Sequence, residues 1–319
     1  MLNRIAVLCL VLLSGLVPSP QADCDAAALR RRGGRYVDVR GLEPSRMSMK
    51  ADSKRSRAFG WLAGCALIIA AGCNRAAAEV IAVPSGDAAR PPTLTMYWEG
   101  PGSKALLILI PGGEGQLNLK PGQLSVGHQF YLTLKQLSRG SDPREILDVV
   151  LFDSPERLEN SRAYPSSRAT PDHMSRIQSV VQFYAEKVRK PIWLMGHSNG
   201  AVSVTEYLRY ERRTGSGDRI AGLIVSGARK LAYFDSAPLD LPILFMSHRY
   251  DGCLNADPNA SFNNFEKVRD LNKAKTSFAY IESGDPEGVR TCESGYHMYN
   301  NATEEVVATL RNFIGPFNR

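Results

Sequence analysis

The sequence lacks three features that would each assign it to a class of protein at once. Its longest predominantly apolar stretches, residues 5–17 and 59–71, fall well short of the roughly 20 residues that a membrane-spanning helix needs. No pair of histidine or acidic residues has the spacing of metal ligands, and no segment repeats or is of low complexity. The apolar runs therefore do not indicate a typical membrane-spanning helix, and we expect no metal and no other cofactor.

The main part of the chain also has little net charge. The formal charge is +7, but residues 1–73 hold 11 Lys and Arg against 5 Asp and Glu, which contributes +6 of it. The other residues hold 28 basic and 27 acidic side chains, a net charge of +1. A nucleic-acid-binding domain needs a basic surface on its folded part. We therefore expect no nucleic-acid partner.

The first 72 residues contain two segments with the layout of an export signal. In the first, Arg4 precedes apolar residues 5–17, and small or turn-forming residues follow as far as Ala22. The second starts at Met47 or Met49, where basic residues 50–57 precede apolar residues 59–71. A translation start at one of these two methionines would explain the doubled signal.

The second segment ends in Gly72-Cys73 and resembles a bacterial lipoprotein signal, in which small residues precede a cysteine that becomes acylated. The resemblance implies lipidation of Cys73 and attachment to the periplasmic side of a bacterial membrane through the lipid. Cys65 has a similar local pattern, but too few apolar residues precede it. An ordinary signal anchor, or a secreted protein, is the alternative. Residues 73–92 are rich in Ala, Pro and small polar residues and predict a tether.

From Thr93 the chain alternates short apolar runs with helical patterns, which predicts an α/β fold with a mostly parallel sheet flanked by helices. Thr170 and Pro171 provide an N-cap and a first-turn proline for one helix. The expected strands are residues 105–110, 146–152, 192–195, 223–226, 241–246 and 277–281, and a last helix is expected over 304–313.

The pentapeptide Gly196-His197-Ser198-Asn199-Gly200 carries the clearest chemical signal. It lies between an apolar strand and an amphipathic helix, as a nucleophile elbow requires. Glycines without Cβ atoms allow so sharp a turn, which would lift the serine hydroxyl above the sheet edge. With this motif, residues 93–319 resemble the α/β-hydrolase superfamily. A glycine-rich turn with a passive serine is the alternative interpretation.

The resemblance implies that an acid and a histidine follow the nucleophile in that order, on loops after later strands. Asp251 follows the expected strand 241–246, and His297 lies between the last strand and the last helix. A neutral histidine held by a carboxylate is the usual base for a serine nucleophile. Asp285 is kept as a fallback acid, and Asp153 follows the wrong strand. The other histidines, His128, His173, His197 and His248, are interpreted as packing or surface residues.

The resemblance also assigns two oxyanion donors. One is the amide of Asn199, directly after the nucleophile, and the other comes from the loop after the strand 105–110, where Gly113 is preferred over Glu114. Cys253 and Cys292 flank the acid and the histidine, so that loops which meet in this way would bring the two thiols into bonding distance. A disulfide is expected there, and two free thiols are the alternative.

Only residues 228–240 separate Gly227 from the next expected strand, which leaves no room for a large cap domain. We expect an open site, or one covered only by loops 116–128 and 155–169. The predicted function is hydrolysis of an ester or related acyl bond of a small-molecule substrate through Ser198, Asp251 and His297. A peptidase or thioesterase shares this machinery, and a catalytically silent lipoprotein that binds a ligand or partner is the alternative from another class. The sequence does not indicate an oligomeric state.

Overall fold

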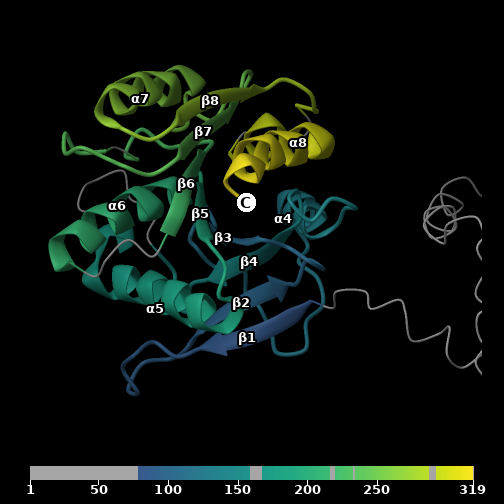
Figure 1. Ribbon diagram of the computed structural model, residues 1–319, viewed down its shortest axis with the longest axis vertical. Coiled ribbons are helices and arrows are strands. Elements are labelled where there is room, and N and C mark those ends of the chain that lie inside the picture. The colour runs from purple at the N-terminus through teal and green to yellow at the C-terminus, as the bar shows by residue number, and fades with distance from the viewer. Residues whose placement is uncertain (1–77, 159–166, 216–219, 233, 287–291, 319) are drawn as a thin grey trace, which may run out of the picture. The chain divides into compact units, whose positions relative to one another are not determined.

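The computed structural model describes residues 78–158, 167–215, 220–232, 234–286 and 292–318. Within them an eight-stranded sheet is flanked by helices (Figure 1). The strands are β1 Glu79–Val83, β2 Thr93–Trp98, β3 Ala105–Ile110, β4 Leu147–Asp153, β5 Ile192–His197, β6 Ile220–Ser226, β7 Ile243–His248 and β8 Thr276–Ile281. The α-helices are α4 Gln129–Lys135, α5 Pro171–Val188, α6 Asn199–Thr214, α7 Pro258–Leu271 and α8 Thr303–Ile314.

The sheet is parallel from β4 to β8, and the first two strands run antiparallel at one edge. The strand order is β1-β2-β4-β3-β5-β6-β7-β8, so that β3 lies between β4 and β5. The chain therefore moves one way from β3 to β4 and then crosses to the other side of β3. In open α/β sheets, ligands bind beyond the carboxyl ends of the strands at such a point of reversal. The loops after β3 and β5 lie there.

Two apolar layers fill the space between sheet and helices. One layer packs α4 and α8 against the sheet, and it includes Phe130, Trp193 and Leu310. The other packs α5, α6 and α7 against the opposite face. Strand β3 contributes to both layers because its six residues are all buried. This explains its continuous apolar sequence, since a central parallel strand has no solvent-facing side.

The predicted fold class and all six predicted strands are confirmed, with boundaries that move by a few residues. Thr170 caps α5 as predicted, because its side chain accepts a hydrogen bond from the His173 amide. The described residues between β6 and β7 include no helix, as expected for a domain without a cap. No described helix is long and apolar enough to cross a membrane.

The predicted tether over residues 73–92 is wrong for part of its length. Residues 79–83 form β1, whose backbone pairs with β2 from Glu79 opposite Tyr97 to Val83 opposite Thr93. The folded domain therefore includes residues before Thr93. The apolar run of β1 is only four residues long and lies between alanine-rich residues and a stretch with Pro84 and Gly86, so residues 73–92 as a whole resembled a linker in composition. The predicted leader and Cys73 lie outside the described residues.

Candidate active site

Ser198 lies on a strained turn between β5 and α6. Its backbone has φ 56° and ψ −119°, a conformation that residues with a side chain rarely adopt. The Ser198 amide donates to the carbonyl of Ser226 at the end of β6 (2.9 Å), which ties the turn to the neighbouring strand. Ser198 is 9% exposed and lines a cleft, so the turn leaves part of the residue accessible.

Glycines make this turn possible. A Cβ on Gly200 would collide with the carbonyl oxygen of Ile110, and a Cβ on Gly196 would collide with the backbone of Gly200. Gly112, in the loop after β3, is constrained as well, because its Cβ would come within 2.8 Å of the Ser198 Cβ. The loop after β3 thus passes directly beside the serine, as the point of reversal in the sheet leads one to expect.

Asp251 and His297 meet although they are far apart in sequence. The His297 Nδ1 donates to Asp251 Oδ2 at 2.7 Å, and both side chains are buried. Asp251 Oδ1 accepts a hydrogen bond from the Cys253 amide (2.9 Å), so both carboxylate oxygens are held. The other ring nitrogen, His297 Nε2, is buried and has no hydrogen-bond partner among the described residues.

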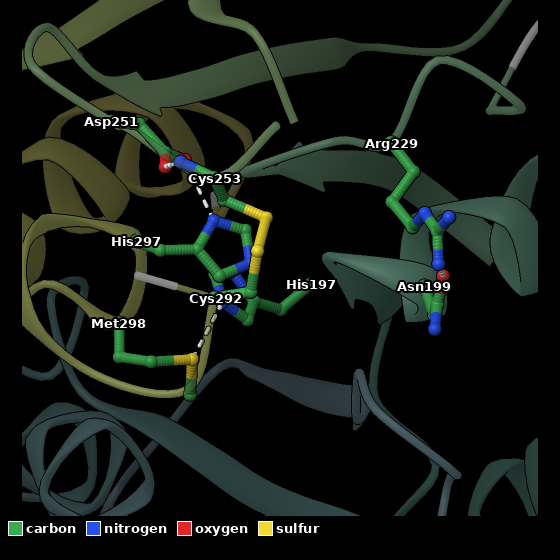
Figure 2. The surroundings of a disulfide bond; sticks show 8 residues. All are labelled: His197, Asn199, Arg229, Asp251, Cys253, Cys292, His297 and Met298. Carbon is green, nitrogen blue, oxygen red and sulfur yellow. Dashed lines mark hydrogen bonds and ion pairs between the residues drawn. A yellow bond between two sulfur atoms is a disulfide. The ribbon is translucent and has the colours of Figure 1, made fainter. Parts of the chain in front are cut away.

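The predicted disulfide between Cys253 and Cys292 is present in the structure, and Figure 2 shows it beside the Asp251–His297 pair. It joins the loop after β7 to the loop that carries the histidine. A second contact between the same loops is a stack of His248 on Tyr296, with ring centroids 4.1 Å apart. The acid and the histidine are therefore held together by side-chain contacts and a covalent bond.

The side chain of His197, which belongs to the elbow, packs beside the His297 ring. Its ring centroid is 5.0 Å from that of His297 and 4.5 Å from that of Phe130. Burial, reinforced by the nearby His297, lowers the pKa of His197 well below its usual value. His197 is therefore a neutral packing partner for His297, which agrees with its interpretation as a packing residue.

A chain of hydrogen bonds sets the tautomer of His197. The Tyr299 hydroxyl donates to the carbonyl of Met246 (3.1 Å), so it can only accept from Ser226 Oγ (2.9 Å). Ser226 in turn accepts from His197 Nδ1 (3.1 Å). The unprotonated Nε2 then faces the sulfur of Met298 at 3.3 Å, a contact drawn in Figure 2.

A cleft of about 290 Å³ opens beside Ser198. Tyr131 and Met298 provide apolar surface, and Gln116 and His128 provide polar groups. Burial raises the pKa of Tyr131 to about 12, so this phenol stays protonated at neutral pH. The complete set of lining residues is Gly112, Gly113, Glu114, Gln116, His128, Tyr131, His197, Ser198, Cys292, Glu293 and Met298.

Gly113 and Asn199, the residues predicted to supply oxyanion donors, are in direct contact. The side-chain amide of Asn199 donates to the Gly113 carbonyl at 2.9 Å. Gly113 has φ 54° and open space around its Cα, and it lines the cleft together with Ser198. The loop after β3 and the start of α6 are therefore fastened to each other next to the serine.

The alternative acids have other roles. Asp153 accepts hydrogen bonds from the amides of Leu117 (2.6 Å) and Leu119 (2.8 Å), which fixes the start of loop 116–128. Asp285 bonds to the side-chain amide of Asn301 at 3.3 Å. Neither meets His297, whose described carboxylate partner is Asp251.

Several residues around the site escaped the sequence-based reasoning. Tyr131 and Met298 line the cleft, and the buried arginines Arg168 and Arg229 lie behind its loops. Arg229 follows β6 by three residues, and polar residues just beyond the carboxyl end of a parallel strand are a usable signal. Arg168 lies in a short 3-10 helix within loop 155–169, which was expected only as a cover of the site, and no pattern in the sequence marks the arginine itself.

A larger hollow of about 400 Å³ lies elsewhere on the domain and includes none of the predicted site residues. Its charges are largely compensated, because Asp172 pairs with both Arg90 and Arg176. No group of three or more His, Cys, Asp or Glu that could hold a metal ion occurs among the described residues.

The chain is similar to known proteins in structure and not in sequence. No protein-family model matches the chain, and no curated protein matches its sequence. A hyperthermophilic esterase from the archaeon Pyrobaculum calidifontis superposes with a TM-score of 0.51 at 13% identity, over 80% of this chain and 88% of that one. Brefeldin A esterase, a bacterial homologue of human hormone-sensitive lipase, gives 0.50 at 14% identity over 76% of each chain. Together with the sheet order and the elbow, these two similarities establish that the chain has the α/β-hydrolase fold.

Proposed function

We propose that this protein is a serine hydrolase that cleaves an ester or related acyl bond of a small molecule, with Ser198 as nucleophile, His297 as base and Asp251 as the acid that orients it. The observation that supports the proposal is the 2.7 Å bond from His297 Nδ1 to Asp251, with a buried and unpartnered Nε2 on the same ring. A bond from Nδ1–H to the carboxylate leaves the lone pair on Nε2, where a serine proton can be accepted.

In this mechanism the Ser198 oxygen attacks the acyl carbon while its proton moves to His297 Nε2. The carbonyl oxygen of the substrate becomes an oxyanion. The backbone N–H groups of Asn199 and Gly113 donate hydrogen bonds to it. Collapse of the tetrahedral intermediate expels the alcohol, which takes the proton from His297 and leaves an acyl-serine. Water, deprotonated by His297, then releases the acid and restores the serine.

The dimensions of the cleft favour a small acyl group. Its volume of about 290 Å³ is at the lower end of ligand-binding pockets. Tyr131 and Met298 suit a short apolar chain, whereas Gln116 and His128 suit a polar group. We therefore propose short-chain, water-soluble esters as the substrate class, ahead of long-chain lipids.

A fluorophosphonate probe tests the proposed chemistry, since an activated serine displaces its fluoride and becomes covalently labelled. We expect wild type to be labelled and Ser198→Ala and His297→Ala to remain unlabelled. Ser261→Ala is the matched control, because Ser261 is also a buried helical serine but lies in α7, away from the elbow. Equal labelling of wild type and Ser198→Ala, or none of either, would contradict the proposal and favour a binding protein.

A series of p-nitrophenyl esters from acetate to decanoate tests the substrate class. We expect kcat/KM to be highest for acyl chains of two to about four carbons and to fall beyond them, because longer chains exceed the cleft. A maximum at eight or more carbons would contradict the proposed class while leaving the serine mechanism intact.

We further propose that Cys73 is acylated and anchors the domain on the periplasmic side of a bacterial membrane. The disulfide between Cys253 and Cys292 supports an address outside the cytoplasm, because such bonds persist in oxidising compartments. The mass of the mature N-terminal peptide tests this directly. An unmodified N-terminus at another residue would contradict the lipid anchor.

A further inference from the structure

Arg168 is a buried cation behind the loop that follows β3. It is 2% exposed, and no carboxylate forms an ion pair with it among the described residues. Burial lowers its pKa to about 9, and the charge of Arg229 acts in the same direction. Burying a charged guanidinium costs free energy of desolvation, so the contacts that Arg168 makes need an explanation.

Those contacts are directed at the loop and at the elbow helix. One terminal nitrogen of Arg168 donates to the carbonyls of Gly112 (3.2 Å) and Gly113 (3.1 Å). The other donates to the Ser203 hydroxyl in α6 (2.9 Å). The planar guanidinium therefore bridges the loop after β3 to the helix that follows Ser198, with several donors in one rigid group.

A second arginine completes the arrangement. The Gly113 carbonyl also accepts from the Asn199 side chain at 2.9 Å, and Asn199 Oδ1 accepts from Arg229 at 2.6 Å. Figure 2 shows the Arg229 guanidinium pointing at Asn199. The orientation of the asparagine amide is thereby fixed, because only its oxygen can accept from Arg229.

These bonds determine where the amide groups of the loop point. In a planar trans peptide the N–H lies opposite the C=O. Since the carbonyls of Gly112 and Gly113 face the arginine, the N–H groups of Gly113 and Glu114 face the other way. Neither N–H has an acceptor among the described residues, and the three loop residues line the cleft with Ser198.

We propose that Arg168, aided by Arg229 through Asn199, is a positioning residue that holds the Gly112–Glu114 loop with its amides aimed at the substrate oxyanion. The proposal rests on the proposed function. N–H donors that already point at the oxyanion position stabilise the transition state without a rearrangement of the loop during the reaction. Hydrogen bonding to a peptide carbonyl also polarises the peptide, which strengthens its N–H as a donor.

The test compares Arg168→Met with Arg176→Met. Arg176 is the matched control because it is also a buried arginine, 2% exposed, but it donates to the Pro91 carbonyl (2.8 Å) and to Asp172 rather than to the loop. Turnover of a short-chain ester and inhibition by an aryl boronic acid are measured. The boronic acid forms a tetrahedral anion when the serine oxygen adds to boron.

We expect Arg168→Met to lower kcat about 10- to 100-fold, less than the 100- to 1000-fold cost of removing a donor outright. KM should stay near its wild-type value, and the boronic acid inhibition constant should rise in parallel with the loss of kcat. Arg168→Lys, which keeps a charged donor, should recover part of the loss. Arg176→Met should lose stability but keep kcat.

Equal kcat in Arg168→Met and Arg176→Met, or a rise in KM with unchanged boronic acid inhibition, would overturn the inference while leaving the serine mechanism in place. If Arg168→Met does not fold, Arg229→Met provides the same readouts, and unchanged values there would overturn it. A wild-type protein that neither hydrolyses esters nor binds the boronic acid would overturn the proposed function and this inference together.

Discussion

The two halves of the candidate site are built in different ways. The nucleophile half is local: Gly196, Ser198 and Gly200 lie within five residues, and their geometry follows from a strand, a helix and missing Cβ atoms. The acid–histidine half joins Asp251 and His297, which lie 46 positions apart, through a hydrogen bond, and a disulfide holds the two loops.

Because the two halves are built differently, different kinds of substitution should disrupt them. The nucleophile half depends on backbone sterics, so it should respond sharply to a single added methyl group. The acid–histidine half depends on bonds between distant loops, so it should respond to loss of a hydrogen-bonding group or of the disulfide. Variants in each half can test whether this division is correct.

The largest expected effect is on catalysis in the acid–histidine half. Asp251→Asn removes the carboxylate that holds the Nδ1–H of His297, and the wrong tautomer then leaves no lone pair on Nε2. We expect kcat for a short-chain ester to fall about 10,000-fold with little loss of stability. Asp285→Asn is the control and should keep its activity. A reversed pattern would show that the acid was misassigned.

The next effect is on folding in the nucleophile half. Gly200→Ala places a Cβ against the Ile110 carbonyl, where backbone atoms cannot yield. We expect a loss of about 5 kcal/mol or a failure to fold, measured by urea denaturation. Gly252→Ala, in the acid loop where nothing lies within 4 Å, is the matched control. It should change stability by no more than about 0.5 kcal/mol. Similar losses of stability in Gly200→Ala and Gly252→Ala would contradict the idea that backbone sterics constrain the nucleophile half more than the acid–histidine half.

Removing the disulfide should affect stability to a slightly smaller extent. The bond closes a loop with a sequence separation of 39 residues. In the loop-entropy model such a link contributes about 4 kcal/mol. We expect the double variant Cys253→Ala, Cys292→Ala to lose about that much and to show lower kcat at temperatures where it is folded. Reductant should reproduce the loss in wild type and leave the double variant unaffected; a reductant effect on both would point to another cause.

The smallest expected effect is on the pH dependence of stability. It comes from two buried histidines, His197 in the nucleophile half and His173 in the neighbouring helix α5. Burial lowers the pKa of His173 to about 3 and that of His197 well below its usual value. Below about pH 6.5 the unfolded chain binds protons that the folded chain does not, so stability falls as pH falls. Each histidine adds a slope of about 1.4 kcal/mol per pH unit, over the window from pH 6.5 down to about 3 for His173.

His173→Gln should remove one histidine's share of this slope, measured as the free energy of unfolding in urea at pH 7, 6 and 5. His128→Gln, at the border of the open cleft, is the control and should keep the full slope. An unchanged slope in His173→Gln would show that His173 is not held neutral by burial.

The sequence predicted the nucleophile half in detail because its signals are local. Apolar runs fixed the central strands, and the glycines of the pentapeptide fixed the turn that the structure contains. The edge strand β1 was missed because its apolar run is only four residues long and lies within a segment rich in Ala, Pro and small polar residues. Helix α7 was missed as well: its Asp257 cap and Pro258 start are a recognisable signal, but its sequence includes few buried residues.

What the sequence by itself determined is the class of fold, the place of Ser198 on the elbow and the order of Asp251 and His297 behind it. Tertiary structure alone decided that the carboxylate of Asp251, and not that of Asp285, meets His297. It also decided that Arg168 donates to the carbonyls of the loop beside the serine, and that Arg229 holds Asn199, which donates to the same loop. The physical reason is the range of the interactions. Turn sterics and hydrophobic periodicity act over a few residues, whereas a hydrogen bond between distant side chains exists only once the sheet has brought its strand ends together.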